Sequence, residues 1–515
     1  MIINLFYKHV QETPDKAAII VDTQELGYLE LSQQIAAFSS ALEKMGVKKG
    51  DHIALILKNS VEFVVIMLAA AHIGAVIVPL NTTFKLNALL KAIEASDATF
   101  VIASKYHLDM ILTAGSTPLS RCICLDENQY GIKSYNEAVA NYANYTLGPV
   151  QLSGLEDYII TMTSGSTGDP KPIVFSQNTK ITRAYSAKDC YKLDGNIISL
   201  AATPLYHSLA QRLVLLPLML GGTAVIMQHF TPKLWLEAVA RHKVTFAIPV
   251  SSQLANILTE FKQNSYDISS LKTLVSSSAL IATELKQALI DTFKCEIHEI
   301  YGASEVGVVT NLSPVDEKDK LGTVGRALPG IDIKIVDDAD NILPIGHVGE
   351  IACKSKTGFV GYYKLPDATG KAMLGGYFHT GDFGSLDEHG FLTFRGRKKD
   401  IIITGGINVY PKDIEDALME SGLLEECAVI GVDDTRLGEA ILAVIVPKDK
   451  SNFTIRSLQK LCFKQLADYQ QPLGYEIIDA LPKNGMSKIS KPALREMFKD
   501  IDLTKDLRNI IKANN

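Results

Sequence analysis

Cysteine is scarce in this sequence, and no cysteine pattern suggests a metal site. The 515 residues include seven scattered cysteines and no Cys-x-x-Cys pair. Cys122 and Cys124 lie too close together in the chain for a usual metal pair. This use of cysteine argues against a cysteine-ligated metal and favours a reducing compartment.

Long apolar runs and a targeting segment are also missing. The longest apolar stretches, residues 63–71 and 213–220, are far too short to span a bilayer. The N-terminal residues 1–6 have no basic region before their apolar residues and no cleavage site, so they do not form a signal peptide. We therefore expect a soluble cytoplasmic protein without integral membrane association.

The sequence has no strong charge of either sign. Its net charge of −6 gives no electrostatic reason to expect nucleic acid or an anionic membrane as a partner. A hydrophobic content of 47% and a charged content of 21% are those of an ordinary globular protein. The length allows about three domains of ordinary size.

Short apolar runs alternate with helix-like segments over most of the chain. This alternation predicts α/β architecture, with two doubly wound subdomains linked in one large domain. The expected strands are residues 17–20, 53–57, 75–80, 98–103, 197–201, 224–227, 244–248 and 274–276. Helices are expected at residues 29–45 and, after a Ser60 cap, through residue 71.

The pattern changes near residue 322. Glycine and aspartate become frequent, the apolar runs shorten to segments such as 331–336, 349–353 and 391–394, and helical patterns disappear. These features predict a small β-rich subdomain. A compact α+β unit follows, with a helix expected at residues 412–420. We place the domain boundary between residues 398 and 399, so that the domains are 1–398 and 399–515.

The stretch from Thr161 to Val174 contains the strongest functional signal. It follows an apolar run and concentrates hydroxyls, two glycines and one lysine, Lys171, within nine residues. Such a loop can offer backbone N–H groups, hydroxyls and a cation to one polyanion. Pro170 and Pro172 restrict the backbone on either side of the lysine. We interpret it as a nucleotide phosphate loop, whose contact residues are Thr163, Ser164, Gly165, Ser166, Thr167, Gly168 and Lys171.

The composition of this loop also allows two other interpretations. Glycine, serine, threonine and proline also dominate ordinary surface turns. A Walker A loop would require Gly before the lysine and Ser or Thr after it, whereas here both neighbours are proline.

A second motif lies at residues 299–305, Glu-Ile-Tyr-Gly-Ala-Ser-Glu. A strand that ends in glycine allows backbone to lie along an adenine face, where Tyr301 can stack. Ser304 supplies a hydroxyl for the α-phosphate or for a substrate carboxylate. Glu305 is an oxygen ligand suited to Mg²⁺ held with phosphates.

In this order the motifs resemble those of the adenylate-forming superfamily, which includes acyl- and aryl-CoA synthetases. The phosphate loop resembles the family's Thr-Ser-Gly-Thr-Thr-Gly-x-Pro-Lys-Gly, and residues 299–305 resemble its Tyr-Gly-x-Thr-Glu. Residues 377–382, 396–400 and 481–491 resemble three further motifs, and Pro-Leu-Tyr-His at 204–207 resembles the segment beside the acyl pocket. The resemblance covers essentially the whole chain. It departs at Pro172, at Ser304 and at residues 277–280, where the family commonly has Gly, Thr and Gly-Gly-Ala-Pro.

The resemblance implies a role for each matching residue. Lys488 would be the catalytic lysine, with Ser304, Glu305 and His207 also at the reaction centre, and Glu305 and Thr163 would be near the metal. Lys399 would be the hinge, and Gly405 and Gly406 would border the coenzyme A path. Further nucleotide contacts would be Ser278, Ala279, Glu299, Ile300, Tyr301, Gly302, Asp382 and Arg397. The acyl pocket would include His207, Ala279, Gly302, Gly307 and Val308. Arg212, five residues after His207, could recognise a second carboxylate, but we expect it to be solvated.

The implied activity is ATP-dependent activation of a fatty or aryl acid to an acyl-adenylate with release of pyrophosphate. Transfer to coenzyme A would then give acyl-CoA and AMP. ATP, Mg²⁺ and coenzyme A are the expected cofactors, and a small carboxylic acid is the expected partner. A stand-alone enzyme that loads a separate carrier protein is the nearest alternative. A P-loop NTPase, which would produce ADP, and a non-catalytic acyl-binding protein are alternatives from other classes.

Overall fold

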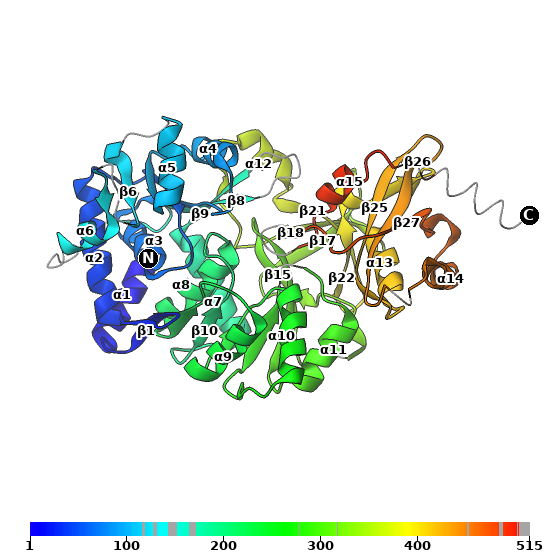
Figure 1. The fold of residues 1–515 in the computed structure, drawn as a ribbon, viewed down its shortest axis with the longest axis horizontal. Helices are drawn as coiled ribbons and strands as arrows, with labels where there is room; N and C mark the ends of the chain where they lie inside the picture. The colour runs from blue at the N-terminus through cyan, green and yellow to red at the C-terminus, as the bar shows by residue number, and fades with distance from the viewer. Residues whose placement is uncertain are drawn as a thin grey trace, which may run out of the picture.

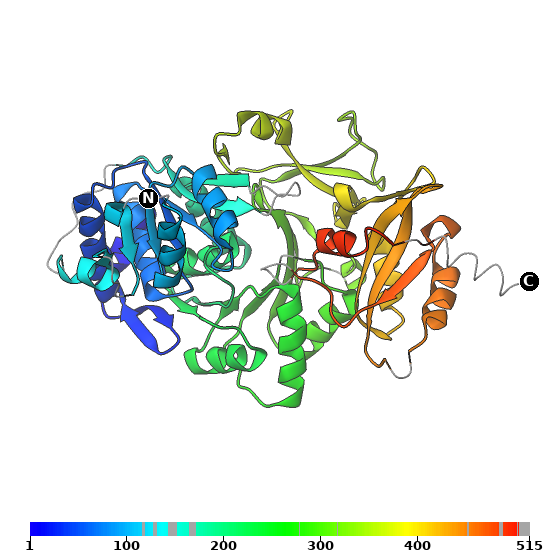
Figure 2. The same ribbon diagram turned by 45° about the horizontal axis from the view of Figure 1, so that its top comes forward.

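The structure is a computed structural model, and it describes residues 1–115, 119–126, 131–142, 152–163, 171–277, 279–316, 318–450, 453–483, 488–501 and 503. Figures 1 and 2 show a large domain with a smaller domain, coloured orange to red, at one end of it. Within the described residues, no helix is long and apolar enough to cross a bilayer.

The first sheet belongs to the N-terminal half of the large domain. Its strand order is β19-β9-β8-β4-β3-β5-β6-β7. The strands from β8 to β7 pair in parallel, whereas β9 pairs antiparallel with both β8 and β19. The bounds are β3 (His52–Ile56), β4 (Val76–Pro79), β5 (Phe100–Ala103), β6 (Cys122–Cys124), β7 (Lys133–Ser134), β8 (Asp157–Thr163), β9 (Lys171–Ser176) and β19 (Gly361–Tyr362).

The second sheet has the order β16-β15-β14-β13-β12-β10-β11-β1-β2. It is parallel from β14 to β1, and antiparallel hairpins close both edges. The bounds are β1 (Ala17–Val21), β2 (Gln24–Gly27), β10 (Ile198–Ala201), β11 (Thr223–Ile226), β12 (Phe246–Ala247), β13 (Thr273–Ser276), β14 (Glu296–Ala303), β15 (Gly307–Leu312) and β16 (Arg326–Ala327). The two predicted doubly wound subdomains are therefore confirmed.

Helices pack between and around these two sheets (Figure 1). They are α1 (Ile2–Glu12), α2 (Tyr28–Lys44), α3 (Val61–Ile73), α4 (Leu86–Ala95), α5 (Lys105–Thr113), α6 (Tyr135–Ala140), α7 (Gln177–Cys190), α8 (Ser208–Leu220), α9 (Pro232–His242), α10 (Ser251–Gln263) and α11 (Thr283–Thr292). α3 begins after Ser60, whose Oγ accepts a hydrogen bond from the Phe63 N–H at 3.2 Å, as the predicted cap requires. One continuous apolar core joins α2, α3, α7 and α8 to strands of both sheets, so it fixes α7 and α8 relative to the strand ends.

The predicted β-rich subdomain is also confirmed. It consists of β17 (Asp332–Val336), β18 (Gly349–Lys354), β21 (Tyr377–Leu386), β20 (Met373–Leu374) and β22 (Leu392–Arg397), which form one antiparallel sheet. A short helix, α12 (Pro366–Ala372), lies in this part of the chain, where no helix was expected. None of its residues is buried, so no apolar periodicity marks it in the sequence.

The small domain is the α+β unit that the sequence predicts. Its sheet has the order β24-β23-β26-β25, with β27 paired to β26. The bounds are β23 (Ile402–Thr404), β24 (Ile407–Val409), β25 (Leu424–Asp434), β26 (Gly438–Pro447), β27 (Gly474–Ile477), α13 (Pro411–Met419), α14 (Ile455–Gln465) and α15 (Lys491–Met497). It has apolar cores of its own. A 3₁₀ turn, η3 (Lys398–Asp400), connects β22 to β23, and the boundary at 398/399 remains a prediction.

Candidate functional site

A tight hairpin between β14 and β15 carries the motif at residues 299–305. Gly302 faces Val308, and Ala303 faces Gly307, across the two strands. A Cβ added at Gly302 would lie 2.0 Å from the Gly307 carbonyl oxygen, so only glycine allows the strands to approach this closely. The turn leaves Ser304 exposed at the end of the sheet. Because ligands of open α/β sheets bind outside the carboxyl ends of the strands, this is where a small molecule is expected to bind.

Arg183, on α7, binds the backbone of this hairpin, and no sequence motif predicts this role. Its Nη2 donates to the backbone oxygens of Ser304 at 2.9 Å and Glu305 at 3.2 Å, and its Nε donates to the Thr357 oxygen at 2.8 Å. The guanidinium also lies 4.6 Å from the centre of the Phe175 ring. Arg183 is buried, so these bonds give two of its three guanidinium nitrogens acceptors that water cannot supply, and they fix the backbone of the turn.

Replacing Arg183 with Met should destabilise the large domain. Three backbone oxygens would lose their donor, and we expect a cost of about 2–4 kcal/mol, or a fall of about 2–5 °C in the unfolding midpoint of a domain of this size. Thermal unfolding followed by circular dichroism measures this shift. The control is Met at Arg241, an exposed arginine in the last turn of α9. An equal midpoint for both variants would contradict the role given to Arg183.

Asp382 lies on β21 beside Tyr301 and is buried. The Tyr301 hydroxyl donates to its Oδ2 at 2.9 Å, and Arg397 Nε lies 3.4 Å from its Oδ1. Burial raises the pKa of the Asp382 carboxyl, while the charges of Arg397 and Lys488 act in the opposite direction. Within the described residues Oδ1 has no hydrogen-bond donor, so this buried acceptor can bind a hydroxyl of a ligand.

Lys488 reaches the same place from the small domain. Burial, together with the nearby charge of Arg397, lowers the pKa of its ammonium to about 8, although the charge of Asp382 acts in the opposite direction. The charge of Lys488 also acts on His207 of the large domain. Asp400 at the connection accepts a hydrogen bond from Arg495 of α15 at 2.9 Å. The structure therefore brings together four residues that the sequence predicted separately: His207, Asp382, Arg397 and Lys488.

His207 is the N-cap residue of α8 and is neutral. Burial and, to a smaller extent, the charge of Lys488 lower its pKa to about 4. Its Nε2 is buried and has no hydrogen-bond partner within the described residues. A neutral imidazole beside the lysine can therefore bind or orient a polar group of a substrate.

Glu305 and Lys171 are connected through Tyr362, a second residue that the sequence reasoning missed. The Tyr362 hydroxyl donates to Glu305 Oε1 at 2.8 Å, and Lys171 Nζ lies 5.4 Å from the centre of the Tyr362 ring. Residues 164–170 of the predicted phosphate loop, and Ser278, lie outside the described residues. Lys171, the first described residue after residues 164–170, therefore lies in the same region as Glu305.

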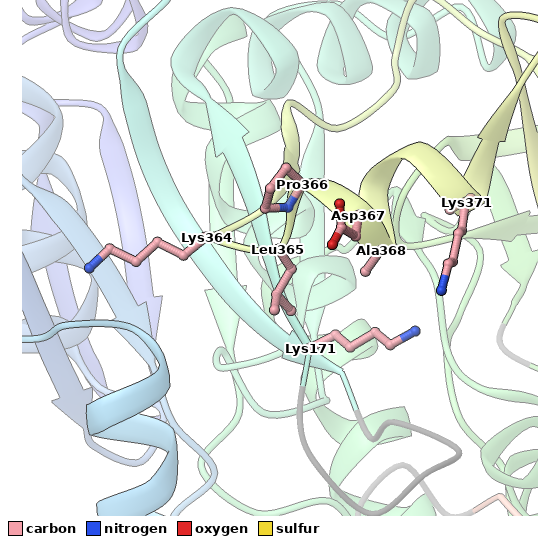
Figure 3. A pocket seen from close by; sticks show the side chains of 8 residues that line it. Lys171, Lys364, Leu365, Pro366, Asp367, Ala368 and Lys371 are labelled. Carbon is pink, nitrogen blue, oxygen red and sulfur yellow. The ribbon is translucent and has the colours of Figure 1, made fainter.

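Lys171 lines a cavity of about 590 Å³ between β9 and α12. In Figure 3 the side chains of Lys171 and Lys371 point into the same space, while Lys364 points away. Lys364 pairs with Asp97 instead. Asp367 also lines the cavity, but the two lysines directed into it allow it to hold an anionic group.

Of the other predicted residues, several are near the site and some have other partners. Glu299 is buried and forms an ion pair with Lys286 at 2.5 Å, so its carboxylate is engaged inside the protein. Ile300 is buried on β14, and Val308 is partly buried on β15. Ala279, Gly405, Gly406 and Lys399 are exposed. Nothing in the structure tests the acyl-pocket, coenzyme A-path and hinge roles, which remain predictions.

The carboxylate of Glu305 suits a metal ion that is also bound by phosphates. The described residues contain no group of three or more His, Cys, Asp or Glu side chains able to hold a metal by themselves. Glu305 has a second carboxylate oxygen beyond the one that accepts from Tyr362. One carboxylate together with phosphate oxygens is a usual set of ligands for Mg²⁺.

Two protein-family models match most of this chain. The family model described as AMP-binding enzyme matches residues 6–363, and that described as AMP-binding enzyme C-terminal domain matches residues 413–488. The feruloyl-CoA synthase of an Amycolatopsis species is 30% identical over 95% of this chain and 98% of its own. The fatty acid–[acyl-carrier-protein] ligase ScoC of Streptomyces coeruleorubidus is 27% identical over 95% of both chains.

A solved structure agrees over nearly the whole length. ATP-bound MatB from Rhodopseudomonas palustris superposes with a TM-score of 0.89 at 27% identity, over 97% of this chain and 99% of that one. The chain therefore belongs to the family of AMP-binding enzymes, the adenylate-forming acid–CoA ligases.

Proposed function

We propose that this protein activates a carboxylic acid with an aliphatic or aryl body and transfers the acyl group to coenzyme A. The observation that carries this proposal is the meeting of Lys488 with Asp382, Arg397 and His207 at the end of the second sheet. A cation, a buried hydroxyl acceptor and a neutral imidazole, contributed by two domains, suit a nucleotide and an acid held side by side.

In the first step a carboxylate oxygen attacks the α-phosphorus of ATP. The bond from that phosphorus to the bridging oxygen breaks, and pyrophosphate leaves. Lys488 would stabilise the charge on the carboxylate and α-phosphate, with Ser304 donating a hydrogen bond nearby. Lys171 and the phosphate loop would hold the leaving phosphates, and Glu305 and Thr163 would hold Mg²⁺, which neutralises phosphate charge when bound. Such catalysis consists mainly of positioning and charge stabilisation.

In the second step a thiol sulfur attacks the acyl carbon, and the bond to the AMP oxygen breaks. The nucleophile comes from the second substrate, so no cysteine of the enzyme is needed. Lys488 has no part in this step, and the small domain would rotate about Lys399 so that the thiol enters past Gly405 and Gly406. A carrier protein could replace coenzyme A, since one relative is named as an acyl-carrier-protein ligase.

The nucleotide product tests the proposal. Purified protein is incubated with ATP, Mg²⁺, coenzyme A and a panel of acids, and the nucleotides are separated by chromatography. We expect AMP and pyrophosphate, formed only when an acid is present. ADP and orthophosphate would contradict the proposal. Replacing coenzyme A with a carrier protein distinguishes the two acceptors.

The adenylation step should weaken in alkaline solution. Because the pKa of Lys488 is lowered to about 8, the free enzyme loses this positive charge as the pH rises through 8. We expect kcat/KM for ATP to fall above about pH 8, since this parameter reports ionisation in the free enzyme. Because bound triphosphate stabilises the protonated form of Lys488, kcat should fall only at a higher pH. Equal alkaline limbs in kcat and kcat/KM for pyrophosphate release would contradict this account.

A further inference from the structure

A second group of cations lies between α7 and α8, behind the β14–β15 hairpin. Lys180, Arg183 and Arg212 line one narrow cavity together with Ala184, Ser208, Leu215 and Leu216. None of these lining residues is acidic. The cavity is small, with a volume of about 10 Å³, roughly the space of one buried water or one carboxylate oxygen.

Arg212 differs from the sequence-based expectation. It was expected to be solvated, but it is only partly exposed, and burial lowers the pKa of its guanidinium. Within the described residues, no hydrogen bond or ion pair is made by its side chain. The α7–α8 packing encloses it because α8 follows directly from the His207 turn and is apolar on most of its surface.

The other two basic side chains, Lys180 and Arg183, have only neutral hydrogen-bond acceptors in the described part of the protein. Lys180 donates to Gln211 Oε1 at 2.9 Å and to Ser208 Oγ at 3.3 Å, both of which are neutral acceptors. Its Nζ lies 4.4 Å from the centre of the Phe175 ring. Arg183 uses Nε and Nη2 for backbone oxygens, as described above, and has Nη1 left over. Burial lowers the pKa of Lys180 well below its usual value, which is the cost of enclosing it without an anion.

Countercharge around the cavity is scarce. The ionisable groups that act on Arg212 are Tyr191 and Cys190, and burial raises the pKa of both, that of Cys190 to about 11, so both are neutral at pH 7. Glu305 acts on Arg183, but its carboxylate already accepts from Tyr362. Keeping all three of these basic side chains charged therefore costs free energy unless an anion joins them.

The cavity is next to the reaction centre. Ser208 follows His207 directly, and Arg183 Nη2 is 2.9 Å from the backbone oxygen of Ser304. We infer that the acid substrate carries a second anionic group, a carboxylate at the far end of its body, which binds between Lys180, Arg183 and Arg212. This inference rests on the proposed function and names the class of acid: a dicarboxylic acid, activated at one end and recognised at the other.

Matched pairs of acids test the inference. Pyrophosphate release is measured for succinate, glutarate, adipate and terephthalate against butyrate, pentanoate, hexanoate and 4-methylbenzoate. For at least one pair we expect kcat/KM for the diacid to exceed that for the monoacid by about tenfold or more. The substitutions Arg212→Leu and Arg212→Gln should each remove most of that preference. The control is Arg241→Leu at an exposed position, and this variant should keep the preference for the diacid.

A second readout does not depend on turnover. The diacid with the largest preference should raise the unfolding midpoint of the wild-type protein, and it should raise that of the Arg212→Leu variant much less. In the absence of ligand, this variant should be at least as stable as the wild type, because an unpaired enclosed charge has been removed.

The outcomes separate this inference from the proposed function. Pyrophosphate release with monoacids equal to or above that with every matched diacid overturns the inference and leaves the proposed function standing. A raised KM for coenzyme A or ATP in the Arg212 variants, with unchanged acid preference, also overturns it, because the cations would then bind a phosphate. Nucleotide products of ADP and orthophosphate would overturn the proposed function itself, and the inference with it.

Discussion

Replacing Lys488 with Ala should slow pyrophosphate release by about 100- to 1,000-fold, the usual effect of removing one charge that stabilises a transition state. The lysine is the cation that the small domain brings to Asp382, Arg397 and His207. Thioester formation from a supplied acyl-adenylate should change little, because the carboxyl group is then already activated. Single-turnover measurements of the two half-reactions provide both rates.

The matched control is Lys483→Ala in the same segment. Lys483 pairs with Glu426 at 2.6 Å, within the small domain. Its removal should leave both half-reactions near their wild-type rates, as expected for a partly exposed ion pair. If Lys488→Ala slowed both half-reactions equally, Lys488 would serve more than adenylation, and the division between the two steps would be wrong.

Replacing Asp382 with Asn should raise KM for ATP by roughly 10- to 100-fold, since a hydrogen bond to a charged group contributes about 1.5–3 kcal/mol. Asp382 offers a buried Oδ1 with no donor among the described residues, while Oδ2 remains bound to Tyr301. Asparagine fills the same space but lacks the charge and can present an N–H where an acceptor is needed. Steady-state kinetics with ATP as the varied substrate measures the change.

Stability and specificity must be separated in this experiment. Asp479→Asn is the control, because Asp479 is an exposed carboxylate that pairs with Lys450 and with no other cation in the described part of the chain. The Asp382 variant should retain its fold and its KM for the acid. An unchanged KM for ATP would remove Asp382 from the nucleotide site, and equal losses for ATP and acid would indicate a general distortion.

The fold could be predicted largely because it follows local patterns. The alternation of apolar runs and helical segments predicts both doubly wound subdomains, and Ser60 predicts the start of α3. The helix α12 escaped prediction because none of its residues is buried. Local periodicity reports burial, so an element without a buried face leaves no pattern to read.

The candidate site was predictable only where its residues occur in continuous motifs. Asp382, Arg397 and Lys488 were predicted in this way, and the structure places them close together, while their roles stay predictions. Arg183 and Tyr362 were missed, because each acts through partners far along the chain: Arg183 on Ser304, and Tyr362 on Glu305. Nothing near either residue in the sequence distinguishes it from a surface arginine or a strand tyrosine. Arg212 was misjudged for a related reason, since helix periodicity says which face a residue occupies and not what covers that face.

The central claim is that the carboxylate of an acid attacks the α-phosphorus of ATP at the site formed by Lys488, Asp382 and Arg397. The most direct test of this claim uses an acid substrate whose carboxylate carries oxygen-18. After turnover, mass spectrometry determines which products contain the label. We expect one labelled oxygen in AMP and none in pyrophosphate. Label in pyrophosphate or orthophosphate, or unlabelled AMP, would contradict the claim.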